Sequence, residues 1–170
     1  MAAFQVTLSA GDSSSSSRPL SSLDLAIVLA SCQLEQFFEA EELLLEQCAA
    51  DLEEVIGRRR CWSVQASALL IRSKLELRQK RHVERAARQA EALAFAVMGV
   101  EGSRVSSEVS LARTRLILAS GLPPYWRVRE VHAEILVSLG WSEEEIRVYE
   151  RPESWEGVVD CYGRKGQRDA

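Results

Sequence analysis

The sequence predicts an all-α protein made of stacked antiparallel helical hairpins, the arrangement of an α-solenoid. Helix-forming residues dominate its 170 residues, hydrophobic residues make up 46% of the chain, and aromatic residues only 6%. Apolar residues recur at helical spacing in successive segments. Short turns containing Gly or Pro separate those segments, which favours helices packed side by side.

The N-terminal region predicts a tail followed by a buried helix. Residues 1–19 are rich in Ser and too polar to order themselves, so we expect a disordered tail. Ser21 and Ser22 can cap a helix from Leu23 to about Cys32. This run is apolar on nearly all sides, and we therefore expect the helix to be well buried.

An acidic helical pattern follows, from Leu34 to Ile56, with Gly57 as the residue that closes it. No Lys or Arg occurs between Arg18 and Arg58. The helix predicted next, Trp62 to Leu77, has a wide apolar face.

A narrower, Ala-rich helix is expected from Val83 to Met98, and small residues on its apolar stripe permit close helix packing. Glu84 and Arg88 on this helix make a favourable pair four residues apart.

The second half of the chain continues the alternation of helices and turns. Gly99–Gly102 is expected to be a loop, and the spacing from Val105 to Ala119 predicts a further helix. After a turn at Gly121–Pro124, a helix is predicted from Tyr125 to Leu139, ending at Gly140. Its expected buried residues are Val128, Ile135, Leu136 and Leu139. Ser142 and Glu145 form a capping box for a short helix to Tyr149, and Arg151–Ser154 is the next turn.

The final segment has the order of a repeat helix. Trp155, Val158, Val159 and Tyr162 share one helical face, and Gly166 ends the run. Their order resembles the first helix of a tetratricopeptide repeat, with Val159 where that pattern has Gly. We expect a tail at 1–19, a helical pre-repeat region at 20–120, and degenerate tetratricopeptide-like helices at 121–170 whose last repeat is truncated. The residues expected to pack the repeats are Trp126, Gly140, Trp155, Val158, Val159, Tyr162 and Gly166.

Charge reverses sign after the acidic helix. Residues 58–88 hold ten basic residues against two acidic ones, whereas the whole chain has a formal net charge of -4. The basic stretch is compatible with contacts to RNA phosphates or with a solvated face that complements the acidic helix before it. Because we expect no interleaved exposed aromatic residues there, nucleic acid is the less favoured partner.

No residue pattern indicates catalysis, a cofactor or a metal. His82 and His132 lie far apart without neighbouring ligands and read as ordinary helical histidines. Cys32, Cys48, Cys61 and Cys161 are irregularly spaced, which is typical of core thiols in a reducing compartment. The apolar run from Leu23 to Ala30 is too short to span a membrane.

Several blocks together resemble the segment before the repeat array of the tetratricopeptide repeat protein 27 family. These blocks, in order, are Pro19–Cys32, Trp62–Glu76, Val83–Ala86, Leu122–Trp126 and Trp155–Tyr162. The resemblance covers about Pro19 to Ala170.

The resemblance implies a non-enzymatic scaffold that binds proteins and assists chaperone-linked assembly of large complexes, notably the U5 particle of the spliceosome. It implies a cytoplasmic protein and leaves a nuclear location open. The chain contains no Asn, so it lacks the Asn and Lys clamp with which some repeat domains bind acidic chaperone tails. Two alternatives remain open: a helical RNA-binding module using residues 58–88, and a truncated fragment without a function of its own.

Overall fold

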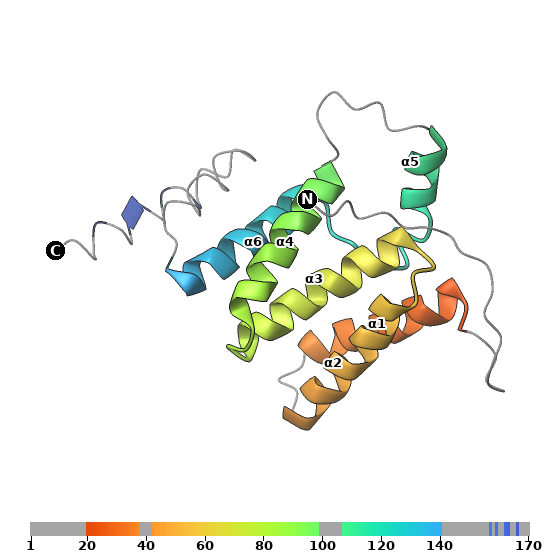
Figure 1. Cartoon of the computed structure of the whole chain (residues 1–170), viewed down its shortest axis with the longest axis horizontal. Coiled ribbons are helices and arrows are strands. Elements are labelled where there is room, and N and C mark those ends of the chain that lie inside the picture. Colours follow the sequence, from red (N-terminus) through yellow and green to blue (C-terminus); the bar gives the residue numbers. More distant parts are fainter. Residues whose placement is uncertain are drawn as a thin grey trace. The chain divides into compact units, whose positions relative to one another are not determined.

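A computed structural model describes residues 20–37, 42–98 and 107–140, together with Gly157, Val159, Tyr162, Gly163 and Gly166. Every regular element within the three continuous ranges is a helix (Figure 1). The helices are α1 (Ser22–Phe37), α2 (Glu42–Gly57), α3 (Trp62–Arg78), α4 (Val83–Met98), α5 (Ser107–Thr114) and α6 (Tyr125–Leu139). The prediction of an all-α, hairpin-based fold is confirmed, with neighbouring helices packed in contact.

The chain forms two compact units, and their boundary falls inside α3. The first unit comprises Met1–Ile71 and Gly102–Leu122, and the second comprises Arg72–Glu101 and Pro123–Ala170. Each unit is therefore built from two separate stretches of sequence. The division into a pre-repeat region and repeat helices at residue 120 remains a prediction.

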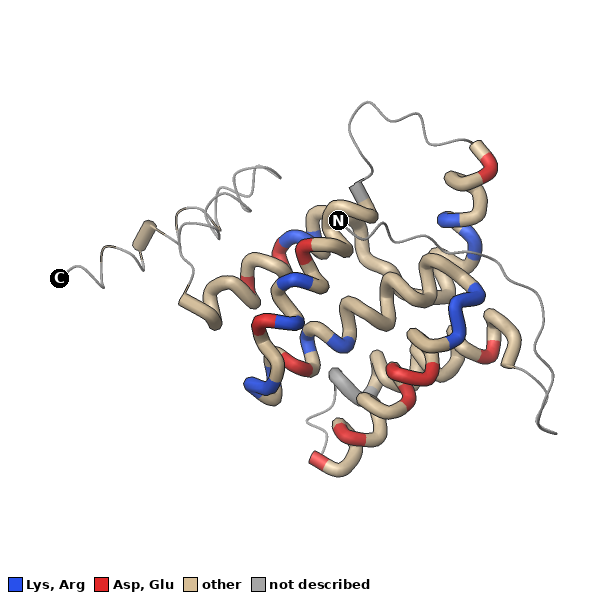
Figure 2. The backbone as a smooth tube through the Cα atoms, viewed as in Figure 1, with Lys and Arg blue, Asp and Glu red and all other residues tan. Residues whose placement is uncertain are grey.

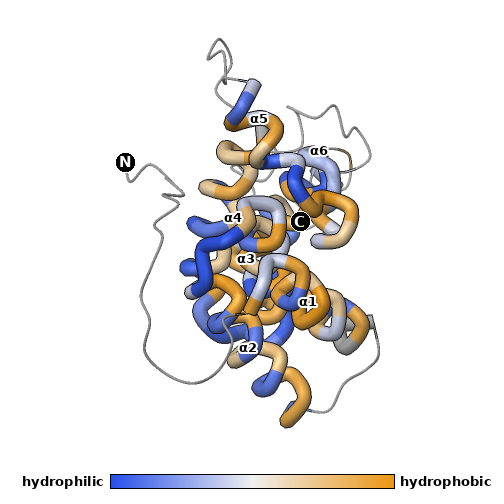
Figure 3. The backbone as a smooth tube through the Cα atoms, turned by 90° about the vertical axis from the view of Figure 1, so that its right-hand side faces the viewer, coloured by the Kyte–Doolittle hydropathy of each residue, from blue (hydrophilic) through white to orange (hydrophobic). Residues whose placement is uncertain are grey.

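In the first unit, α1 begins with the expected cap and buries one face. The Ser21 hydroxyl accepts the Asp24 N–H at 3.2 Å, while the Ser21 N–H donates to the Asp24 carboxylate at 2.7 Å. α2 packs against one side of α1, where Leu25, Ala26, Leu29 and Cys32 are buried. Leu23, Ile27 and Leu34 are exposed, so the expectation of a helix buried on nearly all sides is wrong. Hydrophobic residues recur along α1 (Figure 3).

The acidic pattern forms parts of two helices. α1 ends at Phe37 and α2 begins at Glu42, so the acidic helical pattern predicted from Leu34 to Ile56 is shared between two helices, and residues 38–41 lie outside the described residues. Gly57 is the last residue of α2 instead of the residue after it. The buried face of α2 consists of Leu45, Cys48, Leu52 and Val55.

The described cysteines are core thiols, as predicted. Cys32, Cys48 and Cys61 are all buried. The sulfur atoms of Cys32 and Cys48 each lie about 4 Å from the other residue's carbonyl oxygen, at 3.9 and 4.0 Å, which places α1 and α2 in close contact. Cys161 lies outside the described residues.

α3 begins at Trp62, as predicted. A larger part of its surface is buried than in an amphipathic helix with one apolar face. Every residue from Ser63 to Ile71 is buried, including polar ones. Two of these polar side chains have partners inside the first unit: the Ser63 hydroxyl donates to the Arg115 carbonyl at 2.6 Å, and the Gln65 amide nitrogen donates to the Ile56 carbonyl at 3.1 Å. The Gln65 side-chain oxygen is buried without a hydrogen-bond partner among the described residues. Because these bonds compensate for lost hydration, α3 can carry buried polar residues along a core helix.

α5 is shorter than predicted. It ends at Thr114, and the chain then turns through Leu116, whose φ of 57° is incompatible with a continuing α-helix. The expected helix to Ala119 is therefore wrong, and Val105 lies outside the described residues. The Arg115 carbonyl bonds to the Ser63 side chain of α3. α5 itself contacts α3 through a cation–π interaction, with the Arg113 guanidinium 5.2 Å from the centre of the Trp62 ring.

In the second unit, α4 and α6 pack against each other and have the predicted bounds (Figure 1). Small residues allow this close packing, since Ala86, Ala87, Ala90 and Ala94 of α4 are buried. α6 starts after Pro124 and ends at Gly140, whose φ of 76° places it in the left-handed region. The Gly140 N–H donates to the carbonyls of Leu136 and Val137, closing the helix end. Leu139 is half-buried instead of buried.

Other predicted elements fall on residues that the structure does not describe. These are the tail at 1–19, the loop at Gly99–Gly102, the short helix from Ser142 to Tyr149 and the turn at Arg151–Ser154. Within the described ranges, none of the helices combines the length and the apolar character needed to cross a lipid bilayer.

Candidate interaction surface

The tight connection between α3 and α4 exposes several basic residues. It turns through Lys80 and His82, which have φ values of 52° and 55°. The Arg81 N–H donates to the Glu76 carbonyl at 3.1 Å, and the Ala86 N–H donates to the His82 carbonyl at 3.0 Å. His82 thus lies at the start of α4 and not within a helix, which corrects the expectation of a helical histidine. The side chains of Arg78, Lys80, Arg81 and His82 are exposed.

A buried carboxylate connects the end of α3 to α4. Glu76 is 5% exposed. Arg85 of α4 contacts both of its oxygens, with Nη2 at 2.6 Å from Oε1 and Nε at 3.4 Å from Oε2. Arg72 approaches the same carboxylate at 3.6 Å and also bonds to the Gln89 amide oxygen. The Arg85 guanidinium is therefore held in one position at the surface of α4.

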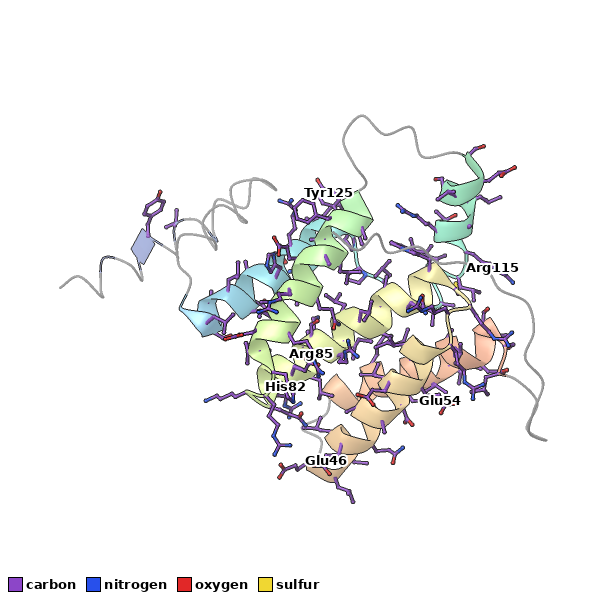
Figure 4. The ribbon with its side chains drawn as sticks, in the orientation of Figure 1. Glu46, Glu54, His82, Arg85, Arg115 and Tyr125 are labelled. Atoms are coloured by element: carbon purple, nitrogen blue, oxygen red, sulfur yellow. The ribbon has the colours of Figure 1, made fainter. Side chains whose placement is uncertain are left out.

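A groove opens beside this network, between the start of α4 and the end of α6. It has a volume of about 570 Å³. Its lining residues are His82, Val83, Glu84, Arg85, Arg88 and Leu139. Because the start of α4 meets the end of α6, the two helices run antiparallel. The lining combines cationic side chains with two half-buried aliphatic ones, Val83 and Leu139. The side chains of His82 and Arg85 are labelled in Figure 4.

His132 is buried within the second unit, on α6. Its burial lowers the pKa of the imidazole below the usual value of 6.5, and the nearby Arg129 lowers the pKa further. Glu91 acts in the opposite direction. As predicted, this histidine lies within a helix. The described residues contain no group of three or more His, Cys, Asp or Glu that could hold a metal ion.

The predicted repeat-packing residues are only partly described, and their role remains a prediction. Trp126 is 47% exposed and stacks edge-on against Tyr125, with ring centres 5.2 Å apart. Gly140 lies at the opposite end of α6 from Trp126. The length of the helix therefore separates these two predicted packing residues. Val159, Tyr162 and Gly166 are exposed, and Trp155 and Val158 lie outside the described residues.

Local carboxylates pair with part of the basic stretch. Arg58 binds Glu54 of α2 at 2.6 Å, and Arg88 lies 3.8 Å from Glu84. Figure 2 shows acidic residues along α2 and basic residues near the start of α4. The exposed residues Arg78, Lys80 and Arg81 of the α3–α4 connection are not among the residues that line the groove. The arginines that do line it, Arg85 and Arg88, each lie beside a carboxylate.

Sequence reasoning identified the basic stretch but missed the groove. Leu139 lies far along the chain from Arg85, and only the packing of α6 on α4 brings the two residues to one surface. The basic residues at 78–88 were visible in the sequence. No sequence pattern indicated that Val83 and Leu139 would form the aliphatic part of the groove.

Adjacent antiparallel helices joined by short turns define a helical scaffold of the solenoid type. Comparison with curated proteins identifies the kind of scaffold. The chain is 39% identical over 153 residues to tetratricopeptide repeat-containing protein trd-1 of Caenorhabditis elegans, covering 89% of this chain and 20% of that protein. It is also 22% identical to a tetratricopeptide repeat protein 27 homolog of Dictyostelium discoideum, over 84% of this chain and 16% of the relative.

A third relative is a TPR repeat-containing protein of Schizosaccharomyces pombe, 25% identical over 88% of this chain and 22% of the relative. These similarities confirm the resemblance found in the sequence and support assignment of the chain to the tetratricopeptide repeat-containing proteins. The chain spans about a fifth of the length of these relatives. No family model and no solved structure matches it.

Proposed function

We propose that this chain is part of a non-enzymatic protein-interaction scaffold that assists chaperone-linked assembly of large complexes such as the spliceosomal U5 particle. One observation carries the proposal: 89% of the chain aligns at 39% identity with a tetratricopeptide repeat-containing protein. Helical hairpins of this class present extended surfaces to other proteins. The partners are therefore proteins, and the assembly role follows from the resemblance to the tetratricopeptide repeat protein 27 family.

The charge distribution supports protein partners over RNA. Arg58, Arg72, Arg85 and Arg88 all lie within 4 Å of carboxylates, so four of the ten basic residues at 58–88 are partly neutralised. Phosphate binding needs cations that release counterions, and local ion pairs reduce that supply.

Recovery of partners from cells tests this function. The tagged chain is expressed, isolated and analysed by mass spectrometry beside an Ile135→Asp variant, in which a charge replaces a fully buried side chain. Chaperone-linked assembly factors and U5 proteins are expected with the native chain and not with the unfolded control. Equal recovery by both chains, or recovery of neither set, contradicts the proposal.

The same cells test the location. A fluorescent fusion of the native chain is expected in the cytoplasm, with a second pool in the nucleus. Restriction of the fusion to the secretory pathway or to mitochondria would contradict this part of the proposal.

A further inference from the structure

Five arginines gather in the first unit, where the connection between α2 and α3 passes the end of α5. They are Arg58, Arg59 and Arg60 on the connection, Arg113 on α5 and Arg115 directly after it. The Arg115 carbonyl lies 3.3 Å from the Cys61 sulfur and accepts the Ser63 hydroxyl at 2.6 Å, which brings the two stretches together. In Figure 4 the labelled Arg115 accordingly lies beside the start of α3. Positive charge from distant parts of the sequence therefore meets at one surface.

Three of these five arginines have no partner in the part of the chain that the structure describes. Arg58 binds Glu54, and Arg113 lies over the ring of Trp62. The exposed side chains that form no ion pair or hydrogen bond with any described residue are Arg59, Arg60 and Arg115. Since like charges held close together repel one another, the negative groups of a ligand are attracted here more strongly than at a single surface arginine.

Exposed aliphatic side chains accompany these unpaired arginines. α5 buries none of its residues, and its Leu111 is 74% exposed. Leu118, which follows Arg115 by three residues, is 94% exposed. Apolar surface is stabilised when a partner covers it, and exposed apolar residues rimmed by polar ones are a feature of protein interaction sites. A ligand that matches both features has negative groups and aliphatic side chains.

The basic residues at 78–88, in the second unit, lack this combination. Arg85 and Arg88 in the groove each lie beside a carboxylate. The cations of the α3–α4 connection are exposed, but no large aliphatic side chain is exposed among residues 78–88. A ligand that is both acidic and aliphatic therefore distinguishes the arginines of the first unit from the rest of the basic stretch.

The backbone under these arginines is fixed before a partner binds. The Arg60 N–H donates to the Arg58 carbonyl at 2.7 Å, and the Ser120 N–H donates to the Leu116 carbonyl at 2.8 Å. The hydrogen bond from the Ser63 hydroxyl to the Arg115 carbonyl connects the two stretches. Less chain freedom is lost on binding here than at a mobile loop, which favours affinity.

A nucleic acid matches this surface less well than a protein segment. The aromatic residue beside these arginines, Trp62, is half-buried and has the Arg113 guanidinium over its ring. Proteins that bind single strands stack the bases on exposed aromatic rings beside the cations. Leucines suit the aliphatic side chains of a peptide instead.

We infer that Arg59, Arg60 and Arg115, together with Leu111 and Leu118, form a docking surface for an acidic segment of a protein partner that also carries aliphatic residues. Carboxylates of that segment pair with the guanidinium groups, and its aliphatic side chains cover the leucines. The inference rests on the proposed scaffold function and specifies the chemistry of one partner.

Direct binding to a defined probe tests this inference. The probe is a fluorescent peptide of Glu residues interrupted by single Leu residues, acetylated and amidated so that its termini carry no charge. Fluorescence anisotropy measures its affinity for the native chain and for R59E/R60E, which reverses two unpaired cations. The matched control R78E/R81E makes the same charge change at two exposed arginines of the second unit.

The native chain and R78E/R81E are expected to bind the probe alike, and R59E/R60E at least about tenfold more weakly. Arg115→Gln also weakens binding, although the backbone carbonyl that accepts the Ser63 hydroxyl is retained. Leu118→Ser weakens binding of this probe but not of a second probe in which Ser replaces Leu, since only the first offers an aliphatic contact. Circular dichroism melting confirms that each variant is folded. If R59E/R60E melts early, R59Q/R60Q takes its place with the same expectation.

Equal affinity of R59E/R60E and the native chain, or an equal loss in R78E/R81E, overturns the inference. Preferential binding of single-stranded RNA over the acidic probe at low salt also overturns it and favours a phosphate ligand. Recovery of assembly factors from cells without probe binding refutes only the docking surface. Probe binding that depends on Arg59 and Arg60, without such recovery, refutes the assembly function and leaves the docking surface.

Discussion

Arg85 of α4 binds the buried carboxylate of Glu76 at the end of α3, with its Nη2 atom 2.6 Å from Oε1. The carboxylate side chain is 7% exposed and the guanidinium side chain is 52% exposed. One end of the pair is thus shielded from water and the other faces the groove. The contact both connects two consecutive helices and orients a cation of the candidate interaction surface.

Removing this arginine should destabilise the protein. Arg85→Ala leaves Glu76 buried with Arg72 as its remaining partner, and we expect a loss of about 1–3 kcal/mol of unfolding free energy, since Arg85 is only partly buried. Urea denaturation monitored by circular dichroism measures this loss. Arg88→Ala is the control, because its pair with Glu84 is exposed on both sides and contributes about 0–1 kcal/mol. Equal losses in the two variants would contradict a structural role for Glu76.

The packing of α4 against α6 predicts a second pair of outcomes. Ala90 is completely buried on α4, and Ala90→Leu inserts a larger side chain into filled space. We expect a cost of about 1–3 kcal/mol, measured by the same denaturation. Ala92→Leu on the exposed side of α4 should change stability by less than about 0.5 kcal/mol. A tolerated Ala90→Leu would show that the two helices separate easily.

The sequence predicted α4 and α6 with their bounds because local signals coincided there. α4 has a clear helical period, and Pro124 and Gly140 flank α6. The break between α1 and α2 carried no such signal, since neither Gly nor Pro interrupts the apolar and acidic pattern from Leu34 to Ile56. Local propensity therefore determines helix bounds only where start and stop residues are present.

The remaining differences depend on contacts between distant residues. α5 ends early where the Ser63 side chain binds the Arg115 carbonyl. The groove is similar in origin, because Leu139 joins Arg85 and Arg88 only after α6 packs on α4. The basic charge of residues 58–88 could be predicted from the sequence, whereas the groove that contains Arg85 and Arg88 could be found only from the tertiary structure.

Gly121 gives a third prediction, in the first unit. Its φ is 59°, and a Cβ atom there would lie 2.7 Å from the amide nitrogen of Gln33. That amide donates to Ser67 Oγ at 3.3 Å and to the Ser120 carbonyl at 3.1 Å, so moving it breaks two contacts. Gly121→Ala should lower the free energy of unfolding by about 1–2 kcal/mol.

Gly57→Ala is the matched control for this substitution. No atom lies within 4 Å of a Cβ placed at Gly57, and the residue ends α2. This change should leave the thermal midpoint unchanged or raise it slightly. A similar decrease in both variants would show that the loss at Gly121 does not arise from Gln33.

The buried His132 makes stability depend on pH near neutrality. Burial lowers the pKa of its imidazole in the folded protein, whereas the unfolded chain has a pKa of about 6.5. Below that value the unfolded state binds more protons than the folded state, so acidification favours unfolding. The stability is fully present above about pH 6.5 and falls as the pH decreases towards the folded pKa. Thermal melting at about pH 7.5 and about pH 5.5 should therefore give a lower midpoint at the acidic pH.

His132→Gln isolates the contribution of this imidazole. The variant lacks the titrating group, so its midpoint should fall less between the two pH values, even if its stability at neutral pH is reduced. Glu91 and Arg129, the charged neighbours that act on the pKa of His132, are both retained. His82→Gln serves as control at an exposed histidine and should keep the native pH dependence. If acidification lowers the thermal midpoints of His132→Gln and of the native chain equally, the neutral state of the buried imidazole does not contribute to the stability of the α4–α6 pair.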